Sequence, residues 1–208
     1  MITLALETST SHGSVALLAD GVILLDERFS ADRSHSATLF TALEKARALT
    51  TPIDFVAVGL GPGSYAGVRI AIAAALGLEL STGARLAGIP SVAALEIPPP
   101  DYLAIGDARR ETFYYTHVAQ GACVEGPLLA SATELSAKLR ELPELPVFAT
   151  EQVAGFPQAQ IALPSAAILA RLAAEGRGIV ATENLEPIYL REPHITRPKP
   201  RPDIPPRP

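Results

Sequence analysis

The sequence predicts an α/β fold in which helices pack on mixed β-sheets. In the first half of the chain, short runs of β-branched and aromatic residues alternate with segments of helical periodicity. A proline break at Pro98–Pro100 separates this half from a second part that again mixes strand-like and helix-like segments. We therefore expect an N-terminal lobe over residues 1–97, a smaller C-terminal lobe over 98–191 and a proline-rich tail over 192–208.

The first half has the predicted element order β-β-β-α-β-α-β. Asp20-Gly21 joins the second and third strands and favours a two-residue hairpin turn. Asp32 or Ser34 can cap the first helix, which is expected to end near Thr50. The predicted strands are 2–7, 15–19, 22–29, 54–58 and 86–89, and the predicted helices are 34–50 and 64–80. This order matches the ribonuclease-H-like half of actin-like ATPases and sugar kinases.

The second half is predicted to be α/β as well. Asp107–Glu111 reads as a charged hairpin between two strands. The predicted strands are 102–107, 112–118, 123–129 and 147–150, and the predicted helices are 134–142 and 165–175. In the tail, four basic residues alternate with prolines, which favours a polyproline-like segment that solubilises the chain or contacts a partner or phosphate.

Composition and charge narrow the class of protein. The chain has 208 residues, 48% of them hydrophobic, and a net charge of −5. It therefore has enough apolar material for a core and no broad basic surface for binding nucleic acid on its own. Its longest uncharged apolar run, Ile70–Leu78, is shorter than the about 20 residues that span a bilayer, so we expect no membrane contact. The single cysteine, Cys123, and the absence of a basic leader predict a cytoplasmic protein.

The turn Gly61-Pro62-Gly63 leads into an unusual helix. Ser64 can cap it, and its charged residues between 68 and 80 are Arg69 and Glu79 alone. Its small residues Gly67, Ala71, Ala74 and Ala75 form one strip, and the bulkier Val68, Ile72 and Leu76 lie on the adjacent face. A sheet covers only one side of a helix, so the remainder must meet another helix of this chain or of a partner.

Nucleotide, nucleophile and metal motifs fit the sequence poorly. Gly61, Gly63 and Ala66 match a dinucleotide fingerprint, but the acidic residue expected about 20 positions later is missing. Ser64 lacks the flanking glycines of a nucleophile elbow, and no lysine completes a Walker A loop. We expect no metal site, because the histidines are not paired at ligand spacing. These histidines are His12, His35, His117 and His194.

The hydroxyl-rich loop after the first strand allows two interpretations. In actin-like ATPases this position is a phosphate loop that follows an aspartate at the end of the strand. Here the acid is Glu7, and Thr8, Ser9 and Thr10 follow it. These four residues are either a vestigial nucleotide loop or an ordinary turn.

Several motifs together closely resemble the TsaB (YeaZ) family. The most specific is the glycine-rich block from Gly61 to Ile70, and Glu7 departs from the family pattern, which has aspartate there. The other matching segments are Leu4–Thr10, Ser14–Leu17, His35-Ser36, Asp107–Arg110 and Pro187–Arg191. The resemblance covers the chain to about residue 191 and implies two actin-like lobes, of the ribonuclease-H-like type, with mixed sheets.

The resemblance also implies a function. Such a protein is a non-catalytic bacterial subunit needed to make N6-threonylcarbamoyladenosine at position 37 of tRNAs that read ANN codons. It would pair with the catalytic subunit TsaD, work with the ATPase TsaE, form a homodimer when alone, and meet tRNA only within the complex. It would bind no cofactor by itself, although a nucleotide can lie at the TsaB–TsaD interface. The alternative is an enzyme that depends on Glu7 or Ser64, either an actin-like ATP-dependent kinase or a glycoprotease-type peptidase.

Finally, the resemblance assigns roles to specific positions. The two N-terminal helices would form the partner interface, and Asp107, Arg109 and Arg110 would contact a partner or brace the hairpin between the lobes. The implied interface residues are His35, Leu39, Leu43, Ser64, Gly67, Val68, Ala71, Ile72, Ala74, Ala75 and Leu78.

Overall fold

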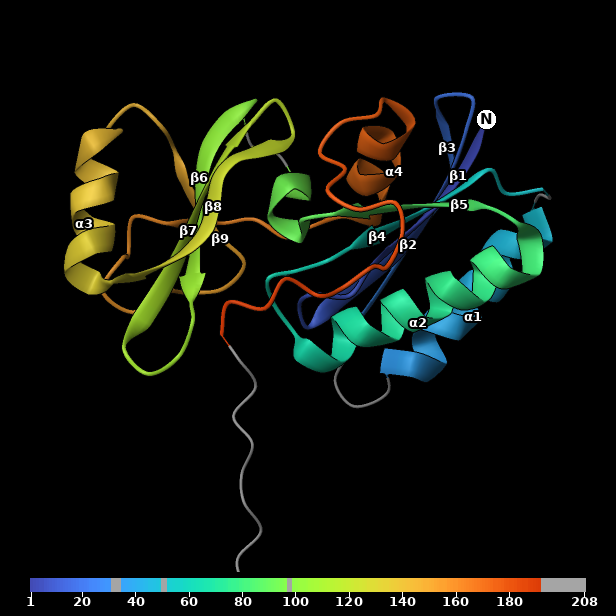
Figure 1. Ribbon diagram of the computed structural model, residues 1–208, viewed down its shortest axis with the longest axis horizontal. Helices are drawn as coiled ribbons and strands as arrows, with labels where there is room; N and C mark the ends of the chain where they lie inside the picture. The colour runs from blue at the N-terminus through green and yellow to red at the C-terminus, as the bar shows by residue number, and fades with distance from the viewer. Residues whose placement is uncertain (31–34, 50–51, 97–98, 192–208) are drawn as a thin grey trace, which may run out of the picture.

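The structure, a computed structural model, contains two β-sheets that lie beside one another (Figure 1). It describes residues 1–30, 35–49, 52–96 and 99–191, with the backbone alone at 35 and 36. The expected helix caps Asp32 and Ser34, the expected helix end at Thr50, the 97/98 boundary and the tail 192–208 lie outside the described residues.

The first sheet has the strand order β3-β2-β1-β4-β5. Strands β1 to β3 form an antiparallel meander, and β4 and β5 run parallel to β1. Its strands are β1 (Ile2–Glu7), β2 (His12–Ala19), β3 (Val22–Ser30), β4 (Phe55–Gly59) and β5 (Arg85–Ile89). The hairpin turn at Asp20 and Gly21 has φ of 47° and 84°, the left-handed conformation that its sequence favours.

The second sheet repeats this topology. Its order is β10-β9-β6-β7-β8, with an antiparallel meander from β6 to β8 and with β9 and β10 parallel to β6. Its strands are β6 (Asp101–Asp107), β7 (Thr112–Ala119), β8 (Ala122–Ser131), β9 (Val147–Ala149) and β10 (Gln160–Ile161). Helix α3 (Ala132–Glu141) follows its third strand, as α1 (His35–Leu49) follows β3. Two mixed sheets of the same order confirm the predicted α/β class of two ribonuclease-H-like, actin-like lobes.

Helices cover both faces of the first sheet (Figure 1). Helix α1 and helix α2 (Tyr65–Thr82) lie side by side on one face, and α4 (Ala166–Ala174) lies on the other. Four alanines in register across the sheet, Ala5, Ala16, Ala57 and Ala87, are fully buried there and let α4 approach closely. The short helix η1 (Ser91–Ala94) follows β5 and contacts α4.

The helix predicted at 165–175 therefore forms, but it packs on the first sheet. The chain then stays with that sheet: Val180 N donates to Gly88 O, and Ile188 N donates to Leu60 O. Sequence periodicity predicts a helix without indicating which sheet it will cover. The division into residues 1–97 and 98–191 remains a prediction.

Helix α2 is longer than predicted and has clear ends. Ser64 Oγ accepts a hydrogen bond from Gly67 N at its start, and Gly83 ends it with φ of 73°. Among the described helices, α2 alone is long and apolar enough to cross a bilayer by length and composition. This is weak evidence for a membrane span, because one side of α2 packs on the sheet as core helices do.

Candidate functional site

The loop after β1 is joined to the start of α2. Thr8 Oγ1 donates to Gly67 O at 2.8 Å, and Ser64 N donates to Ser9 O at 2.6 Å. A Cβ on Gly63 would overlap Ser9 O, and a Cβ on Gly67 would overlap Thr8 O. These two positions therefore require glycine because two backbones cross there without room for a side chain.

Glu7 is sealed beneath this crossing. Its side chain is completely buried, and its Oε1 accepts from Ser9 N at 2.6 Å. Its other oxygen, Oε2, has no hydrogen-bond partner among the described residues. Burial raises the pKa of Glu7, and the hydrogen bond from the backbone N–H of Ser9 offsets part of that rise. As placed, this carboxyl cannot reach a ligand between the lobes.

We expect Glu7→Gln to be more stable than the parent chain near pH 8, by at least about 1–3 kcal/mol, because the variant keeps the shape of the side chain and removes a buried charge. The pKa of Glu7 is higher in the folded than in the unfolded chain, so the parent loses stability as pH rises through these values. The advantage of the variant should vanish well below the ordinary carboxyl pKa of 4.5. Urea unfolding at several pH values measures it.

Glu125→Gln is the control of opposite sign. The pKa of the Glu125 carboxyl is lowered, chiefly by the hydrogen bond from Lys138, so its charge stabilises the fold at neutral pH. The Glu125→Gln variant should therefore be less stable than the parent chain at neutral pH, and the difference should shrink in acid. Equal pH dependence of Glu7→Gln and the parent chain would contradict the assignment of the buried charge.

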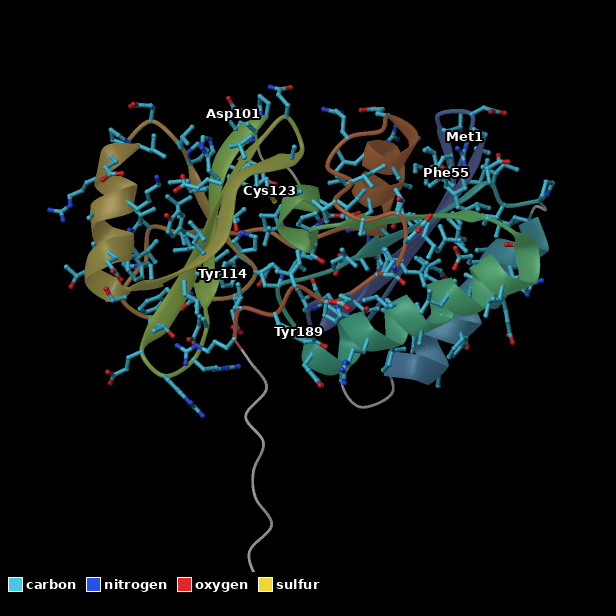
Figure 2. All side chains as sticks on the ribbon, in the orientation of Figure 1. Met1, Phe55, Asp101, Tyr114, Cys123 and Tyr189 are labelled. Carbon is cyan, nitrogen blue, oxygen red and sulfur yellow. The ribbon has the colours of Figure 1, made fainter. Side chains whose placement is uncertain are left out.

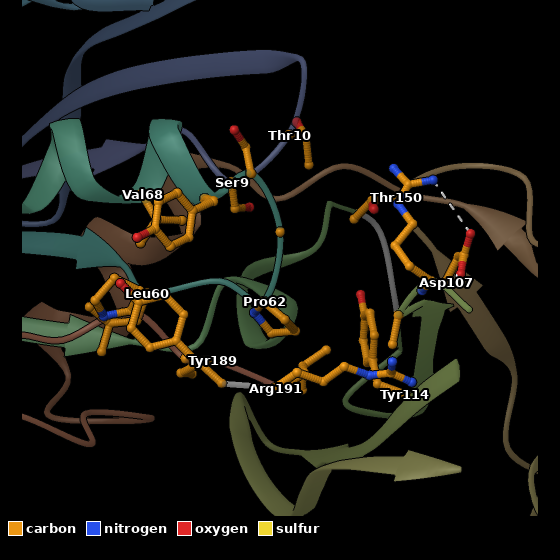
Figure 3. Close-up of a pocket in the computed structure, with 18 of the residues that line it drawn as sticks. Ser9, Thr10, Leu60, Pro62, Val68, Asp107, Tyr114, Thr150, Tyr189 and Arg191 are labelled. Atoms are coloured by element: carbon orange, nitrogen blue, oxygen red, sulfur yellow. Dashed lines mark hydrogen bonds and ion pairs between the residues drawn. The ribbon is translucent and has the colours of Figure 1, made fainter. Parts of the chain in front are cut away.

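A cavity of about 590 Å³ lies between the two lobes (Figure 3). One wall comes from the first lobe, with the loop after β1, the glycine turn and the start of α2. The other comes from the second lobe, and residues 187–191 close one side. The lining includes Ser9, Thr10, Ser11, Leu60, Pro62, Gly63, Ser64, Tyr65, Val68, Asp107, Ala108, Arg109, Tyr114, Thr150, Glu151, Ile188, Tyr189 and Arg191.

Tyr114 lies on β7 (Figure 2), and its hydroxyl points into this cavity (Figure 3). The residue is 6% exposed, and its hydroxyl has no hydrogen bond within the described part of the chain. Burial, with Glu151 nearby, raises its pKa far above the ordinary tyrosine value, so it stays protonated and can donate. Tyr102, a buried tyrosine outside the cavity, differs because its hydroxyl donates to Val92 O at 2.7 Å.

The charged hairpin between β6 and β7 borders the same cavity. Arg109, Arg110 and Glu111 all have positive φ, at 66°, 54° and 59°, which costs non-glycine residues about 1 kcal/mol each. Asp107 holds this turn: its Oδ1 accepts from Arg109 N at 2.6 Å, and its Oδ2 pairs with the Arg109 guanidinium at 3.6 Å. Asp107 thus braces the hairpin, and Arg110 is exposed on it.

Thr112 links the hairpin to the end of the described chain. Its hydroxyl donates to Arg109 O at 2.6 Å and accepts a hydrogen bond from Arg191. At the mouth of the cavity, Arg69 Nε donates to Tyr189 Oη at 2.9 Å, and the Arg69 guanidinium lies 4.4 Å from the Tyr65 ring centre. Residues 187–191 therefore tie α2 in the first lobe to the hairpin in the second.

Comparison with known proteins identifies the family. A family model described as TsaD, tRNA N6-adenosine threonylcarbamoyltransferase, matches residues 30–181. The Escherichia coli tRNA threonylcarbamoyladenosine biosynthesis protein TsaB is 27% identical, over 92% of this chain and 95% of that protein. The chain belongs to the TsaB (YeaZ) family. This family is involved in tRNA threonylcarbamoyladenosine biosynthesis.

Two further proteins are similar to this chain. A solved Pseudomonas aeruginosa structure, described as similar to peptidase YEAZ, superimposes with a TM-score of 0.73 at 28% identity. The superposition covers 91% of this chain and 99% of the Pseudomonas aeruginosa chain. An uncharacterized Mycobacterium leprae protein is 30% identical over 64% of this chain, which spans only 40% of that protein's length.

The structure places most of the interface residues implied for a TsaB-family protein in the core of this chain, and their role at a partner interface stays a prediction. Of the predicted interface residues, those described in the core are Leu39, Leu43, Gly67, Val68, Ala71, Ile72, Ala74, Ala75 and Leu78. They pack between the helices and the first sheet, because an apolar helix turns one of its faces to the sheet. Ser64 caps α2 and lines the cavity, and the side chain of His35 lies outside the described residues.

The other predicted TsaB site residues are split between two places. The cavity brings Ser9, Thr10, Pro62 and Gly63 together with Asp107 and Arg109, whereas Glu7 is sealed away from it. In the described parts of the chain, no three His, Cys, Asp or Glu side chains come close enough to hold a metal ion. Sequence reasoning missed Tyr114, Glu151, Tyr189 and Arg191, which reach the cavity from separate segments.

Proposed function

We propose that this chain is a non-catalytic subunit for the synthesis of N6-threonylcarbamoyladenosine at position 37 of tRNAs that read ANN codons. It would act in the cytoplasm, pair with TsaD and work with TsaE. Membership of the TsaB family supports the pathway, and the match to the TsaD family model supports a related fold in the partner. The observation that carries the pairing is an apolar stripe on the outer side of α2.

This stripe, the exposed α2 face, contains the exposed Ala66, Ala73, Leu76, Gly77 and Leu80 and the half-buried Ile70. Leu80 is 87% exposed and Leu76 37% exposed, and neighbouring α1 adds Phe40 at 51%. Residues 66, 70, 73, 77 and 80 follow alternating spacings of four and three, the repeat by which two helices pack along one another. The face therefore fits a helix from another molecule.

Gly77 adds an independent argument for a close contact. A Cβ built on it would meet nothing within 4 Å, so packing inside the chain does not require glycine there. Glycine in the middle of a helix costs about 1 kcal/mol relative to alanine. A partner backbone that approaches this point would explain the glycine, as small residues do at close helix contacts.

The placement of Glu7 and Ser64 supports a non-catalytic role. Glu7 is sealed, and Ser64 caps α2 and donates its N–H to the neighbouring loop. The kinase and peptidase alternatives each need one of these residues at a substrate.

Size-exclusion chromatography with light scattering tests the proposal, using the chain alone and mixed with TsaD from the same organism. We expect a homodimer alone and a one-to-one complex with TsaD. ATP hydrolysis and peptide cleavage by the isolated chain should be absent. A monomer that ignores TsaD, or turnover by the chain alone, would contradict the proposal.

A further inference from the structure

The Tyr114 hydroxyl indicates that the cavity between the lobes can bind a ligand. A tyrosine hydroxyl that has no hydrogen bond inside the protein can donate one to a ligand. Tyr114 is 6% exposed and directs its free hydroxyl into the cavity (Figure 3).

Two arginines supply positive charge to the same space. Arg109 and Arg191 both line the cavity, and Thr112 hydrogen-bonds to the backbone of the first and the guanidinium of the second. Each guanidinium has five N–H donors, and the contacts with Asp107 and Thr112 leave donors free in both. Arginine forks of this kind favour carboxylate or phosphate groups.

The rest of the lining is apolar and the volume is moderate. Leu60, Pro62, Val68 and Ile188 form the wall of the first lobe. A volume of about 590 Å³ is within the range of small-molecule sites, which combine apolar walls with a few directed polar groups. The cavity thus suits a molecule with an anionic end and an apolar or aromatic body.

The carboxylates do not favour a metal-bound ligand. Those that line the described part of the cavity are Asp107 and Glu151, and Asp107 is bound to Arg109 through both oxygens. Glu7 is sealed below the floor, and the N–H of Ser64 at the start of α2 is bound to Ser9. Divalent cations with phosphates need several free oxygen ligands.

We infer that this cavity binds a small organic anion, a phosphate or carboxylate on an apolar or aromatic body, without a divalent metal. Tyr114, Arg109 and Arg191 hold the anionic group, and the wall around Pro62 and Ile188 holds the body. This site goes beyond the proposed function, because it belongs to this chain and not to its contact with TsaD.

Isothermal calorimetry on the full chain with a chelator present tests the inference with phenyl phosphate, benzoate and inorganic phosphate. We expect phenyl phosphate or benzoate to bind at least about tenfold more tightly than inorganic phosphate, because the ring is buried. The tighter of the two identifies the anionic group. No binding of either ring compound at millimolar concentration, tighter binding of inorganic phosphate, or binding only of ATP with magnesium would overturn the site.

Two variants and a matched control locate the binding. Tyr114→Phe keeps the ring and should weaken binding about tenfold, and Arg109→Gln at least as much. Tyr102→Phe removes a buried hydroxyl outside the cavity and should leave affinity unchanged. Melting temperatures confirm that each variant folds. Equal affinity of Tyr114→Phe and the parent, or an equal loss in Tyr102→Phe, would overturn the assignment of the site.

Discussion

Ala73→Glu should abolish the pairing of this chain with TsaD and leave the chain itself folded. Ala73 is exposed at the middle of the exposed α2 face, so in the free chain glutamate extends into water and changes stability by about 0.5 kcal/mol or less. In a helix contact the same carboxylate would be buried without a partner, which costs about 3–5 kcal/mol. Affinity should fall at least a hundredfold, as measured by calorimetric titration with TsaD.

Ala132→Glu is the matched control for this variant. Ala132 is an exposed alanine at the start of α3, on the second lobe and away from α2. An acid in the first turn of a helix is tolerated or slightly favourable, so folding and pairing should both be preserved. If Ala73→Glu and Ala132→Glu both pair normally, the exposed α2 face is not the contact with TsaD.

The position of this face shows the limit of sequence periodicity. The sequence identified α2 as apolar on nearly every side and separated its small-residue strip from its bulky strip. It could not tell which sides of the helix face the sheet, because the hydrophobic pattern of such a helix has no polar side to mark the solvent. The small-residue strip and most of the bulky strip proved to be core, and a third stripe with Ala73 and Gly77, which the sequence did not single out, is exposed.

Other features were predictable to different degrees. Runs of β-branched residues and hairpin signals indicated nearly all strands, since these depend on local sequence. The return of α4 to the first sheet was not predictable in this way, because it depends on a row of alanines contributed by four separate strands. The cavity is similar: the motifs supplied Ser9, Arg109 and the segment Pro187–Arg191, but nothing in the sequence indicated that this segment and Tyr114 meet at one cavity.

Gly67→Ala and Gly77→Ala should have opposite effects on stability, although both replace glycine by alanine within α2. Alanine favours a helix over glycine by about 1 kcal/mol, so in the monomer Gly77→Ala, which meets no atom of its own chain, should gain about 0.5–1 kcal/mol. At Gly67 the new methyl group would overlap Thr8 O and push the loop after β1 from α2. Overpacking of this kind costs about 1–3 kcal/mol, occasionally more.

Comparing Gly67→Ala with Gly77→Ala measures how tightly the loop after β1 packs on the start of α2. Helix propensity favours alanine at both positions, though less at Gly67 in the first turn, so a loss of stability in Gly67→Ala reports the contact between the β1 loop and α2. Urea unfolding of the two variants and the parent measures that loss. If Gly67→Ala gained stability as Gly77→Ala does, the loop would have room to move, and Glu7 beneath it could be uncovered at little cost. A loss at Gly67 of more than about 2 kcal/mol would instead mean that the crossing is rigid and keeps Glu7 out of reach of any ligand between the lobes.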